Sequence, residues 1–165
     1  MLAQVRIRTW ALTLPAVRLR KDAKVSLLRR VPLFEQCSNR DLGKIGSLAR
    51  EVDYAAGTPI VRQGEPGREL FIIVDGEVDV RSGARKLATL PAGNYFGEMA
   101  LVTGSPRTAS VTTGTPVRAL VIEAKDFRKL LQDSPEIQRK VLAELGRRLE
   151  EQSSRRAPQR IRLRD

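Results

Sequence analysis

Short β-type runs separated by turn residues fill the centre of the chain, and this pattern limits the fold more than any other feature. From Glu51 onward, apolar runs of two to six residues alternate with glycine, proline and Asp-Gly turns. The runs cover residues 60–61, 70–74, 78–80, 87–90, 109–111 and 117–122. Strands of this length at intervals of about 8 to 12 residues predict a β sandwich or a β barrel.

Helical patterns stand on both sides of this region. Residues 22–30 predict a short helix, and Ser38 or Asn39 is suited to cap a second one. After the strands, apolar residues at helical spacing predict a helix over 124–132 and another from Pro135 onward. We therefore expect a mainly β domain flanked by N-terminal helices and two C-terminal helices.

The residue types present exclude several kinds of catalytic site. The 165 residues include no histidine, which excludes histidine-activated nucleophiles, histidine-ligated zinc and histidine proton transfer. The single cysteine, Cys37, cannot form an internal disulfide or a thiolate metal cluster. The longest apolar run, residues 10–17, is shorter than the roughly 18 to 20 residues that span a bilayer, and no signal-peptide cleavage pattern follows it. We expect a cytoplasmic protein without a metal site or a transmembrane segment.

The net charge of +11 lies at the two ends of the chain. Residues 1–30 carry eight Lys/Arg and one acid, residues 147–165 carry seven arginines and three acids, and residues 31–146 carry 15 of each sign. We predict three parts, a flexible basic extension, a folded domain and a disordered Arg-rich tail, over residues 1–21, 22–153 and 154–165. Two interpretations of the tail stay open, namely adhesion to nucleic acid or acidic lipid and a solubilising role.

The segment 97–111 combines features that suit a phosphate-bearing ligand. One helical turn starting at Gly97 would point free backbone N–H groups, including that of Ala100, at an anion. Arg107 could offer a planar, permanently charged fork to the same anion. Glu98 would repel a phosphate, but a ligand that also carries a hydroxyl group resolves this conflict by donating a hydrogen bond to the carboxylate. A phosphate, a hydroxyl and a flat apolar body together describe a ribonucleotide with a single phosphate charge.

This segment resembles the phosphate-binding cassette of cyclic nucleotide-binding domains, as found in protein kinase regulatory subunits, cyclic-nucleotide-gated channels and bacterial catabolite activator proteins. Residues 97–101 (GEMAL) and 106–111 (PRTASV) carry the two parts of the motif. The resemblance covers about residues 31–153, including the early strands and the stretch 146–149 (GRRL) near the end. It implies a jelly-roll β barrel with two closing helices at its C-terminal side.

The resemblance also implies which residues hold the ligand. Glu98, together with Gly97, would bind the ribose 2′-hydroxyl, and Arg107 would pair with the cyclic phosphate. The other contacts would come from the backbone N–H groups of Ala100 and Thr108 at the phosphate, and from Val80, Leu87, Arg148, Gln152 and Ser153 near the base. The bacterial regulators carry a threonine at the position of Gln152.

These residues predict a non-catalytic sensor that binds cyclic AMP, favoured over cyclic GMP, and shifts its closing helix when the ligand binds. No metal ligands or base suited to a phosphodiesterase are present. The sensor would act on an unknown effector protein in trans, and sequence-specific DNA binding is not expected because only 12 residues follow Ser153.

Several alternatives stay open. Arg107 could form a surface ion pair with Glu98 in a ligand-free jelly-roll scaffold, and the basic ends could bind polyanions or nucleic acid. Gly146 fits a hinge in the closing helix or an ordinary exposed helical glycine. Leu142, Leu145 and Leu149 fit packing on the barrel or a homodimer through the C-terminal helix.

Overall fold

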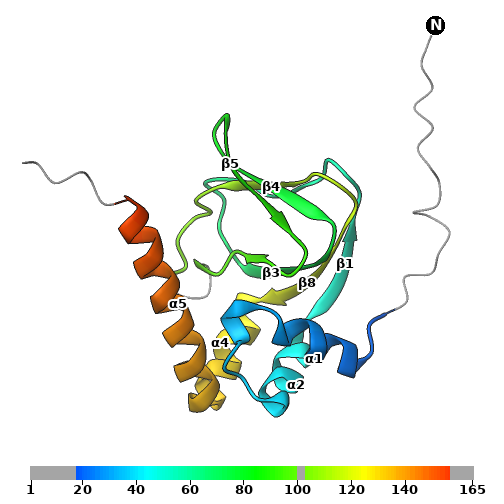
Figure 1. Cartoon of the computed structure of the whole chain (residues 1–165), viewed down its shortest axis with the longest axis vertical. Helices are drawn as coiled ribbons and strands as arrows, with labels where there is room; N and C mark the ends of the chain where they lie inside the picture. The colour runs from blue at the N-terminus through cyan, green and yellow to red at the C-terminus, as the bar shows by residue number, and fades with distance from the viewer. Residues whose placement is uncertain (1–17, 100–102, 157–165) are drawn as a thin grey trace, which may run out of the picture.

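Two antiparallel four-stranded sheets form the centre of the structure, and helices from both ends of the chain pack against one of them (Figure 1). The structure, a computed structural model, describes residues 18–99 and 103–156. Its helices are α1 (Lys21–Arg29), the 3-10 helix η2 (Pro32–Phe34), α2 (Asn39–Leu48), α4 (Ala124–Asp133) and α5 (Pro135–Arg156). Its strands are β1 (Arg50–Tyr54), β2 (Pro59–Val61), β3 (Glu69–Asp75), β4 (Glu77–Ser82), β5 (Arg85–Pro91), β6 (Tyr95–Phe96), β7 (Ser110–Thr113) and β8 (Val117–Glu123).

The strands are divided between the sheets in a jelly-roll arrangement. One sheet has the order β1-β8-β3-β6 and the other the order β2-β7-β4-β5, so most neighbours in space are distant in sequence. In the central pair of the first sheet, Leu70 of β3 lies opposite Ile122 of β8. This topology confirms the predicted mainly β, jelly-roll fold with helices at both ends.

The alternation of side chains along β3 divides the hydrophobic core in two. Leu70 and Ile72 pack among the helices, whereas Phe71 and Ile73 pack between the two sheets. All four side chains are at most 2% exposed. Because successive strand residues point to opposite faces, a strand buried on both faces must be apolar throughout, which explains the unbroken apolar run of β3.

The helical layer is held together by close packing and by one buried ion pair. Gly46 of α2 packs against Leu28 of α1, where an added Cβ would make an ordinary contact at 3.5 Å. Of the two predicted caps, Ser38 is the one that caps α2, and it exchanges hydrogen bonds with Asp41 at 2.9 and 3.1 Å. The Asp41 carboxylate also accepts a hydrogen bond from Lys140 Nζ at 3.0 Å, which ties α2 to α5.

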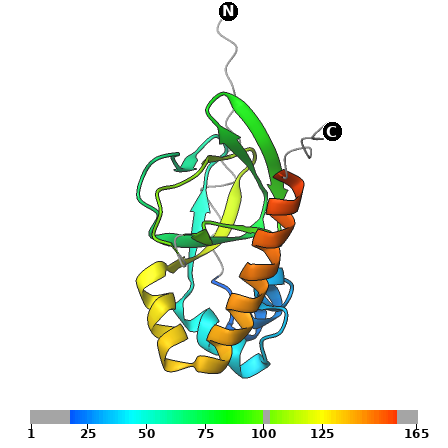
Figure 2. The same ribbon diagram turned by 90° about the vertical axis from the view of Figure 1, so that its left-hand side faces the viewer.

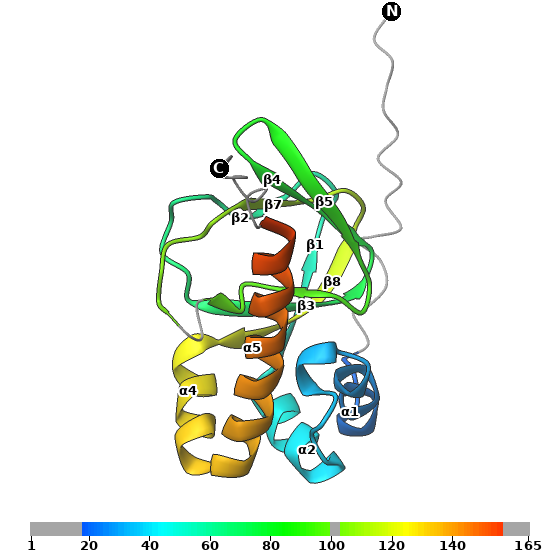
Figure 3. The same ribbon diagram turned by 60° about the vertical axis from the view of Figure 1, so that its left-hand side comes forward.

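The long helix α5 starts beside α4 in the helical layer and then rises along the side of the barrel (Figure 2 and Figure 3). Its first half is anchored by the buried side chains of Ile137, Val141 and Leu145. In the second half, Leu149 is 39% exposed. This course brings the end of α5 beside the strands rather than beside the other helices.

Two strands lie outside the predicted runs. β1 has the sequence REVDY and is only partly buried, so it carries no apolar run. β6 has two residues, which is too short for a periodic pattern. Both belong to the sheet that faces the helices.

The described elements extend a little past the predicted domain limits of 22–153. Leu19 packs against the helical core, and α5 continues to Arg156. Residues 1–17 of the predicted extension and 157–165 of the predicted tail lie outside the described residues. No helix in the part of the chain that the structure describes is long and apolar enough to cross a membrane.

Candidate functional site

A cavity of about 270 Å³ lies between the barrel strands, the segment that follows β6, and the second half of α5. Strand residues from both sheets form its apolar wall, and the residues before β7 form its polar rim. We call it the cassette pocket. Its lining residues are Val61, Val80, Ala88, Leu90, Tyr95, Phe96, Gly97, Glu98, Met99, Ser105, Pro106, Arg107, Thr108, Ala109, Val111 and Arg148.

The Arg107 guanidinium is the main cation of this pocket, and the fold holds it without a counter-ion. Its Nη2 donates a hydrogen bond to the backbone carbonyl of Glu69 at 2.9 Å, and its Cζ lies 5.7 Å from the centroid of the Phe71 ring. Among the described residues, no carboxylate forms an ion pair with it. Burial lowers the pKa of Arg107, while the negative charges of Glu69 and Glu98 oppose that shift. A half-buried cation without an acidic partner is an attractive site for an anion.

The backbone around Arg107 is held as firmly as the side chain. Its N–H donates to the carbonyl of Glu65 at 2.8 Å, and its own carbonyl accepts from the N–H of Gly64 at 2.8 Å. The neighbouring Pro106 forms an isolated bridge with Pro66. These contacts fix the direction in which the guanidinium leaves the main chain.

Gly97 is required because the guanidinium packs directly against its main chain. A Cβ atom at this position would lie 2.6 Å from Arg107 Nη1 and 2.6 Å from the Glu69 carbonyl oxygen. The backbone φ of Gly97 is also +88°, a conformation that side chains disfavour. Any larger residue would therefore displace Arg107 from its place.

Glu98 lies at the pocket, partly buried, at the start of a helical turn. The turn closes where the N–H and hydroxyl groups of Thr103 donate to the carbonyl of Met99 at 3.0 and 3.1 Å. Ala100, the predicted backbone donor within this turn, lies outside the described residues. No ion pair joins Glu98 and Arg107, so the alternative in which they neutralise each other is not the arrangement found.

Tyr95 and Arg148 connect the barrel with α5 across the pocket. The Arg148 Cζ lies 4.2 Å from the centroid of the Tyr95 ring, which is within the range of a cation–π contact. Tyr95 is only 2% exposed, and within the described residues its buried hydroxyl has no hydrogen-bond partner. Burial raises the pKa of Tyr95, and the nearby Arg148 charge opposes this shift.

Of the two barrel residues predicted near the base, Val80 and Leu87, only one lines the pocket. Val80 does, but Leu87 is 50% exposed and lies outside it, while its neighbour Ala88 lines it. The ladder of β4 and β5 pairs Val80 with Ala88 and then Arg81 with Lys86, so Leu87 is the extra residue of a β-bulge. The bulge changes which side chains face inward, and the placement of Leu87 is corrected accordingly.

The residues predicted on the last helix have different positions. Arg148 lines the pocket, whereas Ser153 is exposed and does not. Gln152 belongs to α5, but its side chain lies outside the described residues. Thr108 is exposed at the rim of the pocket, next to Arg107.

Sequence reasoning missed the aromatic support of the site. Phe71 and Phe96 stack with ring centroids 4.8 Å apart and an interplanar angle of 9° beneath the arginine. The signal that could have found them is the Tyr95-Phe96 pair directly before Gly97, because two aromatic residues beside a tight glycine predict a packed wall. Within the described residues, no cluster of acidic or cysteine side chains could hold a metal ion.

Comparison with known proteins agrees with this geometry. The family model described as the cyclic nucleotide-binding domain matches residues 51–134. A cyclic nucleotide-gated potassium channel of Rhizobium etli is 42% identical over 111 residues, which cover 67% of this chain and 31% of the channel. The chain thus spans less than a third of the length of the first channel relatives it matches.

Solved structures with the same fold include two that are 27% identical to this chain. The N-terminal domain of a transcriptional regulator from Streptomyces coelicolor A3(2) matches with a TM-score of 0.72 at 27% identity, covering 82% of this chain and 99% of that one. The regulatory domain of Toxoplasma gondii PKA with cAMP matches with a TM-score of 0.63 at 27% identity, covering 76% of this chain and 50% of that one.

Proposed function

The chain belongs to the cyclic nucleotide-binding domain family, and from this premise we propose that it is a non-catalytic sensor that binds cyclic AMP in the cassette pocket. The structure of the Toxoplasma gondii PKA regulatory domain with cAMP supports this choice of ligand. Cyclic GMP is the nearest competitor, because the exposed Thr108 hydroxyl at the rim could donate to a guanine.

The observation that carries the proposal is the unpaired Arg107 guanidinium. It is partly desolvated, it is oriented by the Glu69 carbonyl, and it has no acidic partner in the described chain. A partly desolvated cation without an acidic partner costs free energy unless an anion binds to it. A singly charged cyclic phosphate supplies that anion, and the planar fork of arginine suits two of its oxygens.

The remaining parts of the pocket suit a ribose and a purine. Glu98, partly buried and without an ion pair to Arg107, would accept a hydrogen bond from the ribose 2′-hydroxyl. The apolar side chains of Val80, Ala88 and Val111 would contact the flat base. A ligand bound in this way has its phosphate at the cassette and its base between the barrel and α5.

The sensing step we propose is a movement of the second half of α5. The first half is anchored by the Asp41–Lys140 ion pair and by buried apolar residues. The second half contacts the barrel through Arg148 and Tyr95 at the pocket itself. A ligand that binds better when α5 is closed would shift the population of this helix toward that position.

The exposed face of α5 suits contact with a partner. Leu142 is 45% exposed and Leu149 is 39% exposed, and a Cβ added at Gly146 between them would meet nothing within 4 Å. Two leucines one heptad apart, with a glycine that permits close approach, support a homodimer through this helix. The same face would be available to an effector protein in trans.

Calorimetric titration of the full chain with cyclic AMP and cyclic GMP tests which of the two nucleotides the chain binds. We expect Arg107→Ala to weaken cyclic AMP binding by about thirtyfold or more, because the phosphate loses its buried partner. Arg107→Lys keeps the charge but not the fork, and its affinity should lie between those of Arg107→Ala and the wild type.

Arg118→Ala is the matched control. Arg118 is also a partly buried arginine, but its Nε donates to Asp53 at 2.9 Å on the first sheet, away from the pocket. We expect this variant to bind cyclic AMP within about twofold of the wild type. An unchanged dissociation constant for Arg107→Ala, or no binding by the wild type, would overturn the proposed function.

A further inference from the structure

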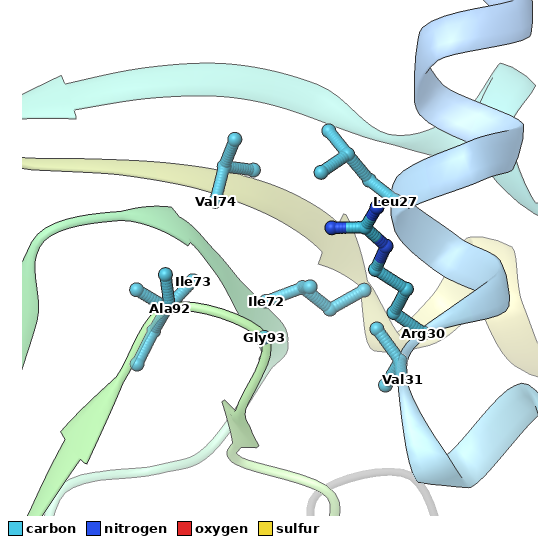
Figure 4. A pocket seen from close by; sticks show the side chains of 8 residues that line it. All are labelled: Leu27, Arg30, Val31, Ile72, Ile73, Val74, Ala92 and Gly93. Atoms are coloured by element: carbon cyan, nitrogen blue, oxygen red, sulfur yellow. The ribbon is translucent and has the colours of Figure 1, made fainter.

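A second cavity, of about 160 Å³, lies between α1, β3 and the turn that joins β5 to β6 (Figure 4). It shares no lining residue with the cassette pocket. The wall is formed by apolar side chains and one cation, and its main members are Leu27, Arg30, Val31, Ile72, Val74 and Ala92. We call it the α1 cavity.

Arg30 gives this cavity a chemical preference. It is the cavity's one charged lining residue, it is exposed at the end of α1, and Figure 4 shows its guanidinium directed over the cavity beside Leu27. Within residues 18–99 and 103–156, its side chain has no ion-pair or hydrogen-bond partner. A hydrophobic wall with one unpaired arginine at its edge matches an apolar molecule that ends in a carboxylate.

The volume limits the size of that molecule. An apolar cavity of about 150 Å³ is known to hold one benzene ring, so the α1 cavity has space for one ring or a chain of about six carbons. We propose that the α1 cavity binds a small apolar monocarboxylate, with the hydrocarbon on Ile72 and Val74 and the carboxylate on Arg30. The chain's own residues 1–17 are a poor occupant, because they carry two arginines and no acid.

The cavity is rigid on its barrel side. The N–H of Gly93 donates to the carbonyl of Ile73 at 2.8 Å, and the N–H of Ile73 donates to the carbonyl of Asn94 at 2.9 Å. These bonds hold the turn against β3, so the wall exists before any ligand arrives. Because the two cavities have separate walls, a carboxylate and a cyclic nucleotide can bind at the same time.

The test is an NMR titration of the ¹⁵N-labelled full chain with benzoate and, as the uncharged control, benzyl alcohol. We expect benzoate to shift the amide signals of Val74, Ala92 and Gly93 with a dissociation constant of about 1 mM, which is typical for a ligand of this size. Benzyl alcohol should shift the same signals more weakly. Cyclic AMP should not displace benzoate. The benzoate titration tests the α1 cavity even if the chain does not bind cyclic AMP.

Three variants separate a built site from general attraction of anions. Arg30→Gln should weaken benzoate binding about fivefold to tenfold and leave benzyl alcohol unchanged. Arg29→Gln removes a neighbouring exposed arginine that does not line the cavity. This variant should bind both benzoate and benzyl alcohol like the wild type. Ala92→Leu should abolish binding of both by filling the cavity, and folding is retained because Ala92 is exposed.

Several results would overturn the proposal. They include no shifts at about twenty times the expected dissociation constant, shifts confined to the cassette pocket, and equal losses for Arg29→Gln and Arg30→Gln. The fluorescence of Trp10, the single tryptophan, provides one more result that would overturn the proposal. A shift of its emission to longer wavelength on adding benzoate would assign the cavity to the chain's own N-terminal segment.

Discussion

At the scale of single residues, the cassette pocket depends on two side chains of opposite charge that do not neutralise each other. Arg107 contacts a carbonyl and an aromatic ring, and Glu98 forms no ion pair within the described residues. Partly buried charges left without partners destabilise a site unless a ligand satisfies them. A single molecule that carries a phosphate and a hydroxyl would supply an anion for Arg107 and a hydrogen-bond donor for Glu98.

Glu98→Gln tests this division of roles. Because the amide oxygen is a weaker acceptor than a carboxylate, we expect cyclic AMP affinity to fall about fivefold to tenfold. The affinity for 2′-deoxy cyclic AMP should stay within about twofold, since the hydroxyl that Glu98 serves is already absent. Calorimetric titration of both ligands measures the difference.

Glu65→Gln is the control for this prediction. Glu65 contributes its backbone carbonyl to Arg107, but its side chain is exposed and does not line the pocket. It should bind both ligands like the wild type. Equal losses for the ribose and deoxyribose ligands in Glu98→Gln would remove the role that we assign to Glu98.

At the scale of elements, α5 consists of a half anchored in the helical layer and a half that contacts the cassette pocket. Buried apolar residues and the Asp41–Lys140 pair hold the first half, while Arg148 reaches the pocket from the second. Gly146 lies between the halves, exposed, with open space where a Cβ would be. Glycine lowers the cost of bending a helix at this position, so Gly146 fits the hinge that the proposed movement of α5 needs.

Gly146→Ala should favour the straight helix. Alanine stabilises a helix by up to about 1 kcal/mol relative to glycine, and nothing within 4 Å would clash with the new methyl group. Because the straight α5 places Arg148 at the pocket, we expect a higher melting temperature and cyclic AMP affinity raised by up to about fivefold. Thermal unfolding and calorimetric titration measure the two effects.

Gly43→Ala in α2 is the matched control, since its added Cβ would make an ordinary contact with Lys21 Cε at 3.6 Å. It should stabilise the fold in the same way without changing affinity. Weaker cyclic AMP binding in Gly146→Ala would show that the bent helix is the binding form, and the assignment of the closed state would be reversed.

At the scale of the whole molecule, the net positive charge of the described residues lies outside the barrel. Residues 18–48 carry eight basic and three acidic side chains, while residues 49–134 carry eleven of each. One of the three acids, Asp41, is nearly buried and faces Lys140. The Asp41–Lys140 ion pair thus joins two parts of the helical layer that are 99 residues apart in the chain.

This ion pair makes stability depend on pH. Burial alone would raise the pKa of Asp41, but hydrogen bonds from the Ser38 backbone and from Lys140 outweigh it, and the pKa lies below the ordinary 3.8. The stabilisation is therefore present above pH 3.8 and is lost as the pH falls through the lowered value. The pKa of Lys140 is raised above 10.5, mainly by its hydrogen bond to Asp41, so its contribution is complete below 10.5 and is lost only in stronger alkali.

Asp41→Asn should be less stable than the wild type by about 1 to 3 kcal/mol at pH 7, because Lys140 loses its buried acidic partner and keeps only the exposed Glu136. The difference should shrink as the pH is lowered below 3.8, where the wild-type carboxylate becomes protonated. Urea unfolding at a series of pH values measures it. Asp53→Asn, which removes the exposed partner of Arg118, should differ from the wild type by less than about 1 kcal/mol at every pH.

A stability difference between Asp41→Asn and the wild type that does not change with pH would show that the carboxylate charge is unimportant. Equal destabilisation by Asp53→Asn would show that the position of the pair, buried or exposed, does not matter. Either result would remove the role given to the Asp41–Lys140 pair in anchoring α5.

The sequence alone predicted the helices on both sides of the barrel, six of its eight described strands and the location of the cassette. These features depend on local signals, such as the apolar run of β3, the Ser38 cap and the turn residues between strands, and each of these signals lies within a few neighbouring residues. The pairing of a glycine, an acid and an arginine within residues 97–107 is likewise local. It was enough to predict a ligand with one phosphate and one hydroxyl.

The tertiary structure decided which residues line the cassette pocket. The Glu69 carbonyl and Phe71 meet Arg107 across a gap of more than thirty residues. The bulge at Leu87 turns Ala88 inward instead, because one extra residue in a strand reverses the face of the side chains beyond it. Contacts of this kind arise only when distant segments are brought together by packing, and no pattern of neighbouring residues encodes their register.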